Sequence, residues 1–151
     1  MLVITKGEIG GAQTHVVELC RSLKDQVHFT AVIGGTDDNS FLSSELKALG
    51  VHVITLPALR NSLNPYRIAA SIQGLLPQIR LHQPHVIHVH SAVAGVVARI
   101  AGKISQTPVV YTVHGFGFKP QARPLIRWSA WIAEAMMAAW TCLLYTSPSP
   151  R

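Results

Sequence analysis

Apolar residues along this chain follow two alternating patterns. Short apolar runs predict buried β-strands, and stretches in which apolar positions recur every three or four residues predict amphipathic helices. The expected strands are Leu2–Thr5, Val27–Ile33, Val51–Leu56, Val86–His90 and Val109–Val113. Apolar strands that alternate with helices are typical of a parallel sheet covered on both faces. We therefore expect an α/β protein with a doubly wound parallel sheet.

The helices predicted between these strands have recognisable ends. One begins with Asn64 as its N-cap and Pro65 as its first helical residue, and Pro77 is expected to kink or end it. The other helices are expected to begin at Ala12, to cover Ser40–Leu49, to follow a Ser91 cap, and to cover Pro124–Trp140. Ligands of such sheets bind at the carboxyl ends of the strands, so the loops there are the places to look for chemistry.

The first of these loops is rich in glycine. Gly7-Glu8-Ile9-Gly10-Gly11 lies between a strand and a helix. Glycine lets the backbone approach a ligand, and the start of a helix attracts an anion. The spacing fits neither the dinucleotide motif G-x-G-x-x-G nor a P-loop. Two interpretations stay open here, a turn that faces a phosphate and a tight turn with no ligand.

Histidines end two of the later strands. His88 and His90 are two residues apart in a strand, so both imidazoles face one side of the sheet. They form either a metal site or a hydrogen-bonded structural pair, and the lack of a nearby Cys or carboxylate favours the pair. His114, in "TVHGFGF", follows the fifth strand. It either contacts a substrate hydroxyl, takes part in proton transfer, or is only structural.

Composition narrows the class of protein. The chain has 151 residues, 48% hydrophobic and 13% charged, which indicates one well-packed domain. Cys20 and Cys142 suggest no disulfide framework, so a reducing cytoplasm is expected. Residues 1–46 carry three basic and six acidic side chains, whereas residues 47–141 carry nine basic and one acidic. The basic part favours a phosphorylated substrate or an anionic membrane. Nucleic acid is not expected, because the basic residues are scattered singly.

The last ten residues differ from everything before them. Cys142–Arg151, "CLLYTSPSPR", matches a translated transposase adapter from sequencing libraries, so we expect a cloning or assembly scar after a domain of residues 1–141. The alternative is a natural proline-rich terminus. Without this tail, the apolar stretch from Trp128 keeps 14 residues. These would form about 21 Å of helix, too short for a hydrocarbon core of about 30 Å.

Three segments, in this order and spacing, carry a family resemblance: "GEIGGAQTHVVEL", "QPHVIHVHSAVAGVVARIAG" and "PVVYTVHGFGF". Over about residues 2–141 the chain resembles the N-terminal, acceptor-side domain of family 4 glycosyltransferases, whose GT-B architecture has two Rossmann-like domains facing a cleft. The resemblance implies a retaining enzyme that moves a sugar from a nucleotide-sugar donor to a glycan or lipid-linked acceptor, as in cell-surface polysaccharide or glycolipid synthesis. It implies no cofactor, no essential metal, a missing C-terminal domain, and a fragment that is inactive alone.

The resemblance also implies roles for individual residues. Gly10 and Gly11 would lie against the donor diphosphate, and His114 would be the catalytic residue that contacts the donor sugar near the reacting carbon. His85 stands where the family frequently has Asp, which is expected to alter a turn contact rather than the chemistry. The residues on the acceptor side would be Gln13, His15, Arg60, His90 and Ser91.

Two other functions stay open. A nucleotide- or dinucleotide-binding module would use Asp37 or Asp38 as its ribose contact, although the glycine spacing argues against it. A membrane-peripheral domain would instead place aromatic and basic residues on an anionic surface, unless that helix packs on the sheet or on the missing domain. Because a lipid-linked acceptor would be reached at a membrane, we expect a cytoplasmic protein that is peripheral on the inner face of the cell membrane. The residues of this surface would be Arg123, Arg127, Trp128, Trp131 and Trp140.

Overall fold

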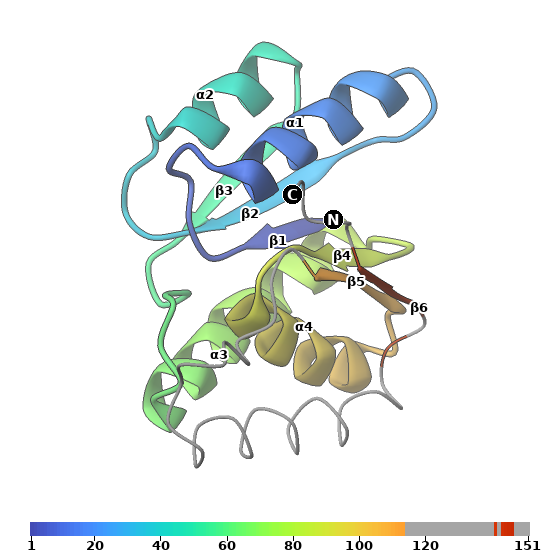
Figure 1. The fold of residues 1–151 in the computed structure, drawn as a ribbon. Coiled ribbons are helices and arrows are strands. Elements are labelled where there is room, and N and C mark those ends of the chain that lie inside the picture. The colour runs from blue at the N-terminus through green and yellow to red at the C-terminus, as the bar shows by residue number, and fades with distance from the viewer. Residues whose placement is uncertain (114–140, 142, 147–151) are drawn as a thin grey trace.

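Six parallel strands form one sheet in the computed structural model, which describes residues 1–113, 141 and 143–146. The strands lie in the order β3-β2-β1-β4-β5-β6. Helices α1 and α2 cover one face of this sheet, and α3 and α4 cover the other (Figure 1). The predicted doubly wound α/β fold is therefore confirmed. The elements are β1 (Leu2–Ile4), α1 (Gly11–Leu23), β2 (Thr30–Gly34), α2 (Phe41–Ala48), β3 (His52–Leu56), α3 (Pro65–His82), β4 (Ile87–Val89), α4 (Ala92–Ser105), β5 (Val109–Val113) and β6 (Leu143–Thr146).

Each face of the sheet has its own core because successive strand residues point to opposite sides. On the face of α1 and α2, Ile4 packs in a buried cluster with Val16. On the face of α3 and α4, Val3 packs in a second cluster with Leu75. Strand β1 lies between β2 and β4, where the chain changes direction across the sheet. The carboxyl ends of β1 and β4 therefore flank the topological switch point, where doubly wound proteins bind ligands.

Helices α2 and α3 both begin with side-chain caps, and the cap of α3 at Asn64 is the one that the sequence predicts. Ser40 Oγ accepts a hydrogen bond from the backbone N–H of Ser43 at 3.4 Å. Asn64 Oδ1 accepts from the N–H groups of Tyr66 and Arg67 at 3.0 and 3.4 Å. Each cap pairs backbone donors that the first turn of a helix leaves unbonded. Helices α1 and α4, in contrast, begin without a side-chain cap.

Of the two outcomes predicted for Pro77, a kink or an end of the helix, the structure excludes the end, because α3 continues past it. The helix continues to His82 and ends at Gln83, which has a left-handed φ of 43°. A proline inside a helix removes one backbone donor, and its ring crowds the carbonyl four residues earlier. Leu75 and Ile79, on either side of Pro77, are both buried against the sheet. Their packing holds both halves of the helix in place and offsets the lost hydrogen bond.

Strand β2 begins later than the sequence predicts. The apolar pattern predicts a strand from Val27, but pairing begins at Thr30, opposite His52 of β3. Val27 instead follows α1 in a turn, in which its N–H donates to the carbonyl of Leu23 at 2.9 Å. Val27 is 42% exposed, so this apolar residue is not part of the core.

Strand β6 comes from the segment that the sequence analysis sets apart as a tail. It pairs in parallel with β5, with Val110 opposite Leu143 and Val113 opposite Thr146. The prediction of five strands is therefore one short, and this part of the tail belongs to the fold. Backbone pairing offers a physical reason, because an edge strand such as β5 presents unpaired N–H and C=O groups to any extended segment nearby. The adapter origin of the segment stays a prediction.

Candidate functional site

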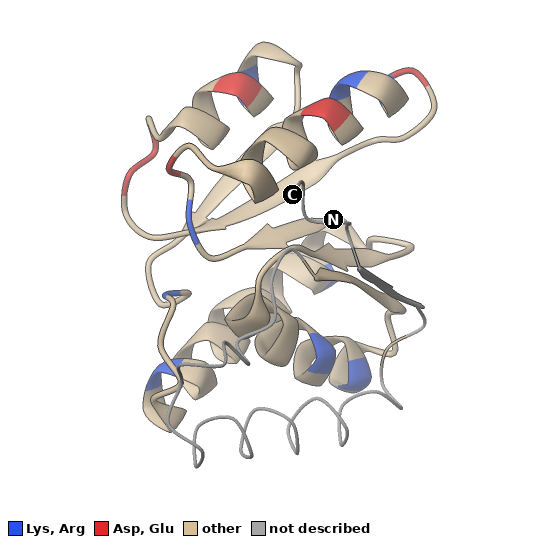
Figure 2. Ribbon diagram, in the orientation of Figure 1, with Lys and Arg blue, Asp and Glu red and all other residues tan. Residues whose placement is uncertain are grey.

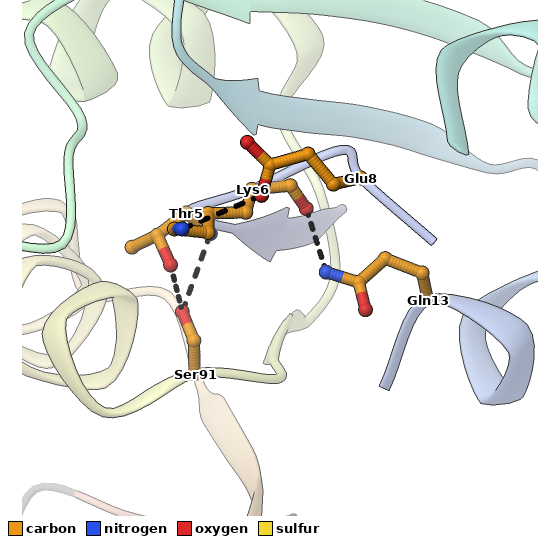
Figure 3. Close-up of polar contacts among 5 residues, drawn as sticks. All are labelled: Thr5, Lys6, Glu8, Gln13 and Ser91. Atoms are coloured by element: carbon orange, nitrogen blue, oxygen red, sulfur yellow. Dashed lines mark hydrogen bonds and ion pairs between the residues drawn. The ribbon is translucent and has the colours of Figure 1, made fainter. Parts of the chain in front are cut away.

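Ser91 joins the two strand ends that flank the switch point (Figure 3). The backbone N–H of Thr5 donates to Ser91 Oγ at 3.2 Å, and the Thr5 hydroxyl donates to the same oxygen at 3.1 Å. Ser91 stands at the N-cap position of α4, but its side chain makes no cap hydrogen bond. The prediction that Ser91 caps this helix is therefore wrong in its role, because the hydroxyl binds β1 instead.

The glycine turn presents open backbone at the start of α1. Gly10 is the N-cap residue, and no side chain caps the helix. A Cβ atom on Gly11 would meet nothing within 4 Å, and Gly11 is exposed. A Cβ atom on Gly10 would come within 2.8 Å of Gln13 Oε1. The start of α1 is therefore not capped by a side chain and is unobstructed at Gly11, an arrangement suited to an anion.

Two further contacts hold the loop that follows β1. Gln13 Nε2 donates to the carbonyl of Lys6 at 2.9 Å, which fastens the loop to α1. The Lys6 ammonium pairs with Glu8 at 3.3 Å, and both side chains are more than half exposed. An exposed ion pair of this kind contributes little to stability. Figure 3 shows Gln13 approaching the loop from α1, while Ser91 reaches the end of β1 from another side.

Two adjoining cavities lie along the carboxyl edge of the sheet. The switch-point cavity, lined by Gln13, His90, Ser91 and Tyr111 among others, has a volume of about 290 Å³. The second, which we call the glycine-floored cavity because Gly7, Gly34 and Gly35 are among its lining residues, has a volume of about 350 Å³. Each is near the lower limit of about 300 Å³ for small-molecule sites. The second cavity is lined in part by Gly7, Gly34, Gly35, Glu8, Asp37 and Arg60.

A histidine cluster extends from the switch-point cavity along the α1 face of the sheet. The rings of His88 and His90 are 4.1 Å apart, so the prediction that they share a face is confirmed. The His15 ring lies 5.8 Å from His90, and His88 Nε2 is 2.8 Å from Thr112 Oγ1. His90 itself is buried, with 2% of its surface exposed. Among the described residues, no group of three or more His, Cys, Asp or Glu could hold a metal ion.

The structure brings most of the predicted acceptor-side residues together. Gln13, His90 and Ser91 line the switch-point cavity, and His15 contacts His90. Arg60 lies apart from them, in the glycine-floored cavity, where its Nε donates to the carbonyl of Pro57 at 3.3 Å. His114, the predicted catalytic residue, is outside the described residues.

Three residues that the sequence analysis does not single out line both cavities. They are Thr5, Lys6 and Asn61. Thr5 and Lys6 directly follow β1, and Asn61 lies in the loop between β3 and α3. The sequence predicts ligand-binding loops after the strand ends, so their position in these loops was the signal that could have identified them. Side-chain type alone gave no reason to choose them.

Charge divides the described part of the molecule into two layers (Figure 2). All the acidic residues drawn lie on α1, α2 and the loops beside them, whereas α3 and α4 carry basic residues only. Residues 48–113 contain five basic side chains and no acidic one. The layer that contains α3 and α4 therefore has a net positive charge, although Arg99 in it is buried.

Sequence comparison identifies related proteins. The family described as "Glycosyl transferase 4-like domain" matches residues 10–150. The UDP-Gal:alpha-D-GlcNAc-diphosphoundecaprenol alpha-1,3-galactosyltransferase of Escherichia coli is 28% identical over 78 residues, which cover 51% of this chain and 20% of that protein. The chain thus matches about a fifth of the length of this curated relative.

Solved structures resemble the fold closely. HepE from Anabaena, crystallised in complex with UDP, has a TM-score of 0.68 at 19% identity, covering 95% of this chain and 36% of HepE. MurG of Acinetobacter baumannii has a TM-score of 0.63 at 11% identity, covering 99% of this chain and 43% of MurG. At these identities the likeness establishes a shared fold, and this chain spans less than half of either protein.

Proposed function

This chain belongs to the glycosyl transferase 4-like domain family, and from that membership we propose that it is the acceptor-side domain of a retaining glycosyltransferase. The proposed reaction moves a sugar from a nucleotide-sugar donor to a glycan or lipid-linked acceptor, in cell-surface polysaccharide or glycolipid synthesis. The observation that carries the proposal is the open glycine turn at the start of α1, which adjoins a polar cavity at the switch point. HepE has been crystallised with UDP and with UDP-glucose, which supports a nucleotide-sugar donor.

On the donor side, the backbone at Gly10 and Gly11 binds the diphosphate. The leaving nucleoside diphosphate gains negative charge as the sugar departs, and the positive end of α1 stabilises that charge. His114 contacts the donor sugar near its reacting carbon. The domain absent from this chain supplies the rest of the nucleotide site, so the chain alone is inactive. The reaction uses neither a cofactor nor an essential metal.

On the acceptor side, the switch-point cavity holds the hydroxyl that receives the sugar. Ser91 Oγ already accepts two hydrogen bonds from Thr5, which leaves its own proton to donate to a ligand. The amide of Gln13 and the ring of His90 line the same space. Together these groups offer both donors and acceptors, as recognition of a sugar hydroxyl requires. His15 supports the His90 ring, and Arg60 lies further along the acceptor path.

The protein acts in the cytoplasm, peripherally on the inner face of the cell membrane. The basic layer of α3 and α4 supports attraction to anionic lipid (Figure 2). The E. coli relative is named for an acceptor that is a diphosphoundecaprenol, a lipid. No helix in the described part of the chain is both long and apolar enough to cross a membrane. The tryptophan surface predicted around Trp128 lies outside the described residues.

The alternative of a dinucleotide-binding module is less well supported. One of the two candidates for its ribose contact, Asp38, already accepts a hydrogen bond from the Thr55 hydroxyl. Isothermal titration of the chain with UDP-glucose and with NAD separates the two functions. We expect the nucleotide sugar to bind in preference to NAD, and a preference for NAD would contradict the proposal.

The reaction itself is tested on the complete reading frame that contains this chain. Its product should release UDP, or another nucleoside diphosphate, from a nucleotide sugar when an acceptor is present. The 151-residue chain alone serves as the control and should release none. Turnover by the chain alone would overturn the proposed division of the site between two domains.

A further inference from the structure

The glycine-floored cavity continues the switch-point cavity along the carboxyl edge of the sheet. The two share Thr5, Lys6 and Asn61 as lining residues, so a ligand in one adjoins a ligand in the other. Their volumes are about 350 Å³ for the glycine-floored cavity and about 290 Å³ for the switch-point cavity. One hydroxyl-bearing ring in the switch-point cavity would leave the larger cavity for a second part of the same acceptor.

Charge in the glycine-floored cavity is mixed rather than basic. Glu8 and Asp37 supply two carboxylates, and Lys6 and Arg60 supply two cations. These four side chains carry no net charge together, and Lys6 and Glu8 already form an ion pair, so the cavity does not favour a phosphate over a neutral ligand. Sugar hydroxyls both donate and accept, so they can donate to the carboxylates and accept from the guanidinium and the ammonium. The chemistry therefore fits a neutral polyhydroxylated ring.

The floor of this cavity is backbone. A Cβ atom on Gly34 would lie 2.1 Å from the carbonyl oxygen of Leu59, so the loop after β3 packs directly on the end of β2. Gly35 has a φ of +111°, and a Cβ atom there would meet nothing within 4 Å. Gly34 therefore allows the two loops to pack closely, and Gly35 presents backbone without a side chain to the cavity, which a ring can approach.

We propose that the glycine-floored cavity is a second sugar subsite, so that the acceptor is an oligosaccharide whose penultimate ring is bound by Asp37 and Arg60. This inference rests on the proposed function and adds to it the class of the acceptor. The reacting sugar occupies the switch-point cavity, and the next sugar along the chain occupies the second cavity. Asp37 and Arg60 determine specificity and take no part in the transfer itself.

Asp37→Asn provides a selective test. Asp37 Oδ1 accepts from the N–H of Asn39 at 2.9 Å, and asparagine can keep this turn because its side-chain carbonyl also accepts. The variant therefore removes the charge and leaves the loop in place. Asp25→Asn is the matched control, since Asp25 is exposed and follows α1 at the other edge of the sheet. Arg60→Gln is paired with Arg80→Gln, in the last turn of α3, in the same way.

Binding is measured on the whole chain by saturation-transfer NMR. The probes are glucose, galactose and N-acetylglucosamine, the disaccharides made from them, NAD, and UDP-glucose. We expect at least one disaccharide to bind more tightly than its component sugars. Asp37→Asn and Arg60→Gln should each weaken disaccharide binding about tenfold, because each removes a charged hydrogen-bonding group. Neither variant should change the affinity for a monosaccharide by more than about twofold, and neither control variant should change the affinity for a disaccharide by more than that. A twofold change in affinity is well below the contribution of one charged hydrogen bond.

Several results would overturn the second subsite. One is equal binding of disaccharides and monosaccharides, another is no effect of Asp37→Asn on any sugar, and a third is displacement of the disaccharide by NAD. Binding of UDP-glucose without binding of any sugar probe also overturns it, while the donor half of the proposed function stands. If no sugar probe binds, the second subsite fails. The proposed function fails separately if the product of the complete reading frame releases no nucleoside diphosphate from any nucleotide sugar.

Discussion

Removing the Ser91 hydroxyl tests whether the link between β1 and β4 holds the site together. Ser91→Ala deletes the acceptor of two hydrogen bonds, from the backbone N–H and the hydroxyl of Thr5. Thr5 is 6% exposed, so water can replace the lost acceptor only poorly. The side chain does not cap α4, so the loss falls on the contact between the two strands rather than on the helix.

The expected cost follows from the two bonds. A hydrogen bond contributes about 0.5–1.5 kcal/mol net, and a buried donor left without an acceptor costs about 1–3 kcal/mol. Ser91→Ala should therefore lower the free energy of unfolding by about 2–3 kcal/mol. Thr5→Val removes only the hydroxyl bond and should cost about 1 kcal/mol. The double variant should cost about 1 kcal/mol less than the sum of the two, because both remove the same hydroxyl contact.

Urea unfolding followed by far-ultraviolet circular dichroism measures all three variants. Asn64→Ala is the matched control, because Asn64 is a true cap that shares no hydrogen bond with Thr5. It should cost about 1 kcal/mol and add to Thr5→Val without coupling. The reasoning is refuted if Ser91→Ala costs less than about 0.5 kcal/mol, the usual effect of a neutral surface change, or if its effect adds fully to that of Thr5→Val.

Three further predictions concern glycine and cysteine. Gly34→Ala should destabilise the fold by at least about 2 kcal/mol in urea unfolding, because its Cβ would lie 2.1 and 2.5 Å from the carbonyl oxygens of Leu59 and Thr5. An unchanged urea midpoint would show that the backbone shifts to accommodate the Cβ at little cost. Gly11→Ala should leave the melting temperature unchanged or raise it, since nothing lies within 4 Å of its Cβ position. In the product of the complete reading frame it should weaken UDP-glucose binding measured by calorimetry, and unaltered binding would argue against the donor position of Gly11. Burial raises the pKa of Cys20 from 9.0 to about 11. Its unfolded thiol therefore ionises first, so stability should fall as pH rises from about 9 to 11, and Cys20→Ala should lose this component.

Local patterns predicted the parts of the fold that depend on neighbours in the sequence. The cap at Asn64 and the proline after it need only the next few residues, and both are as predicted. The apolar run Val109–Val113 was also sufficient to locate β5. The glycine turn was found for the same reason, because its strand and helix lie on either side of it.

Features that depend on distant residues could not be predicted in this way. A serine before a helix usually caps it, and nothing near Ser91 indicates that its hydroxyl oxygen instead accepts hydrogen bonds from Thr5, 86 residues away. The continuation of α3 past Pro77 depends on burial that only the packed sheet provides. The placement of Arg60 and Asn61 depends on how closely their loop packs on β2, a contact that no periodicity reports.

The link between Thr5 and Ser91 also bears on how the site forms during synthesis. Strand β1 pairs with β2 and with β4, the second of which follows about 85 residues later in the chain. The first half, from β1 to β3, can bury its own cluster around Ile4 and Val16 as soon as it leaves the ribosome. Contacts between distant segments close slowly. The glycine-floored cavity is lined only by residues 5–61, so it can form with this first half. The switch-point cavity also needs His90, Ser91 and Tyr111, so a nascent chain cannot bind a ligand there until β4 and β5 have docked.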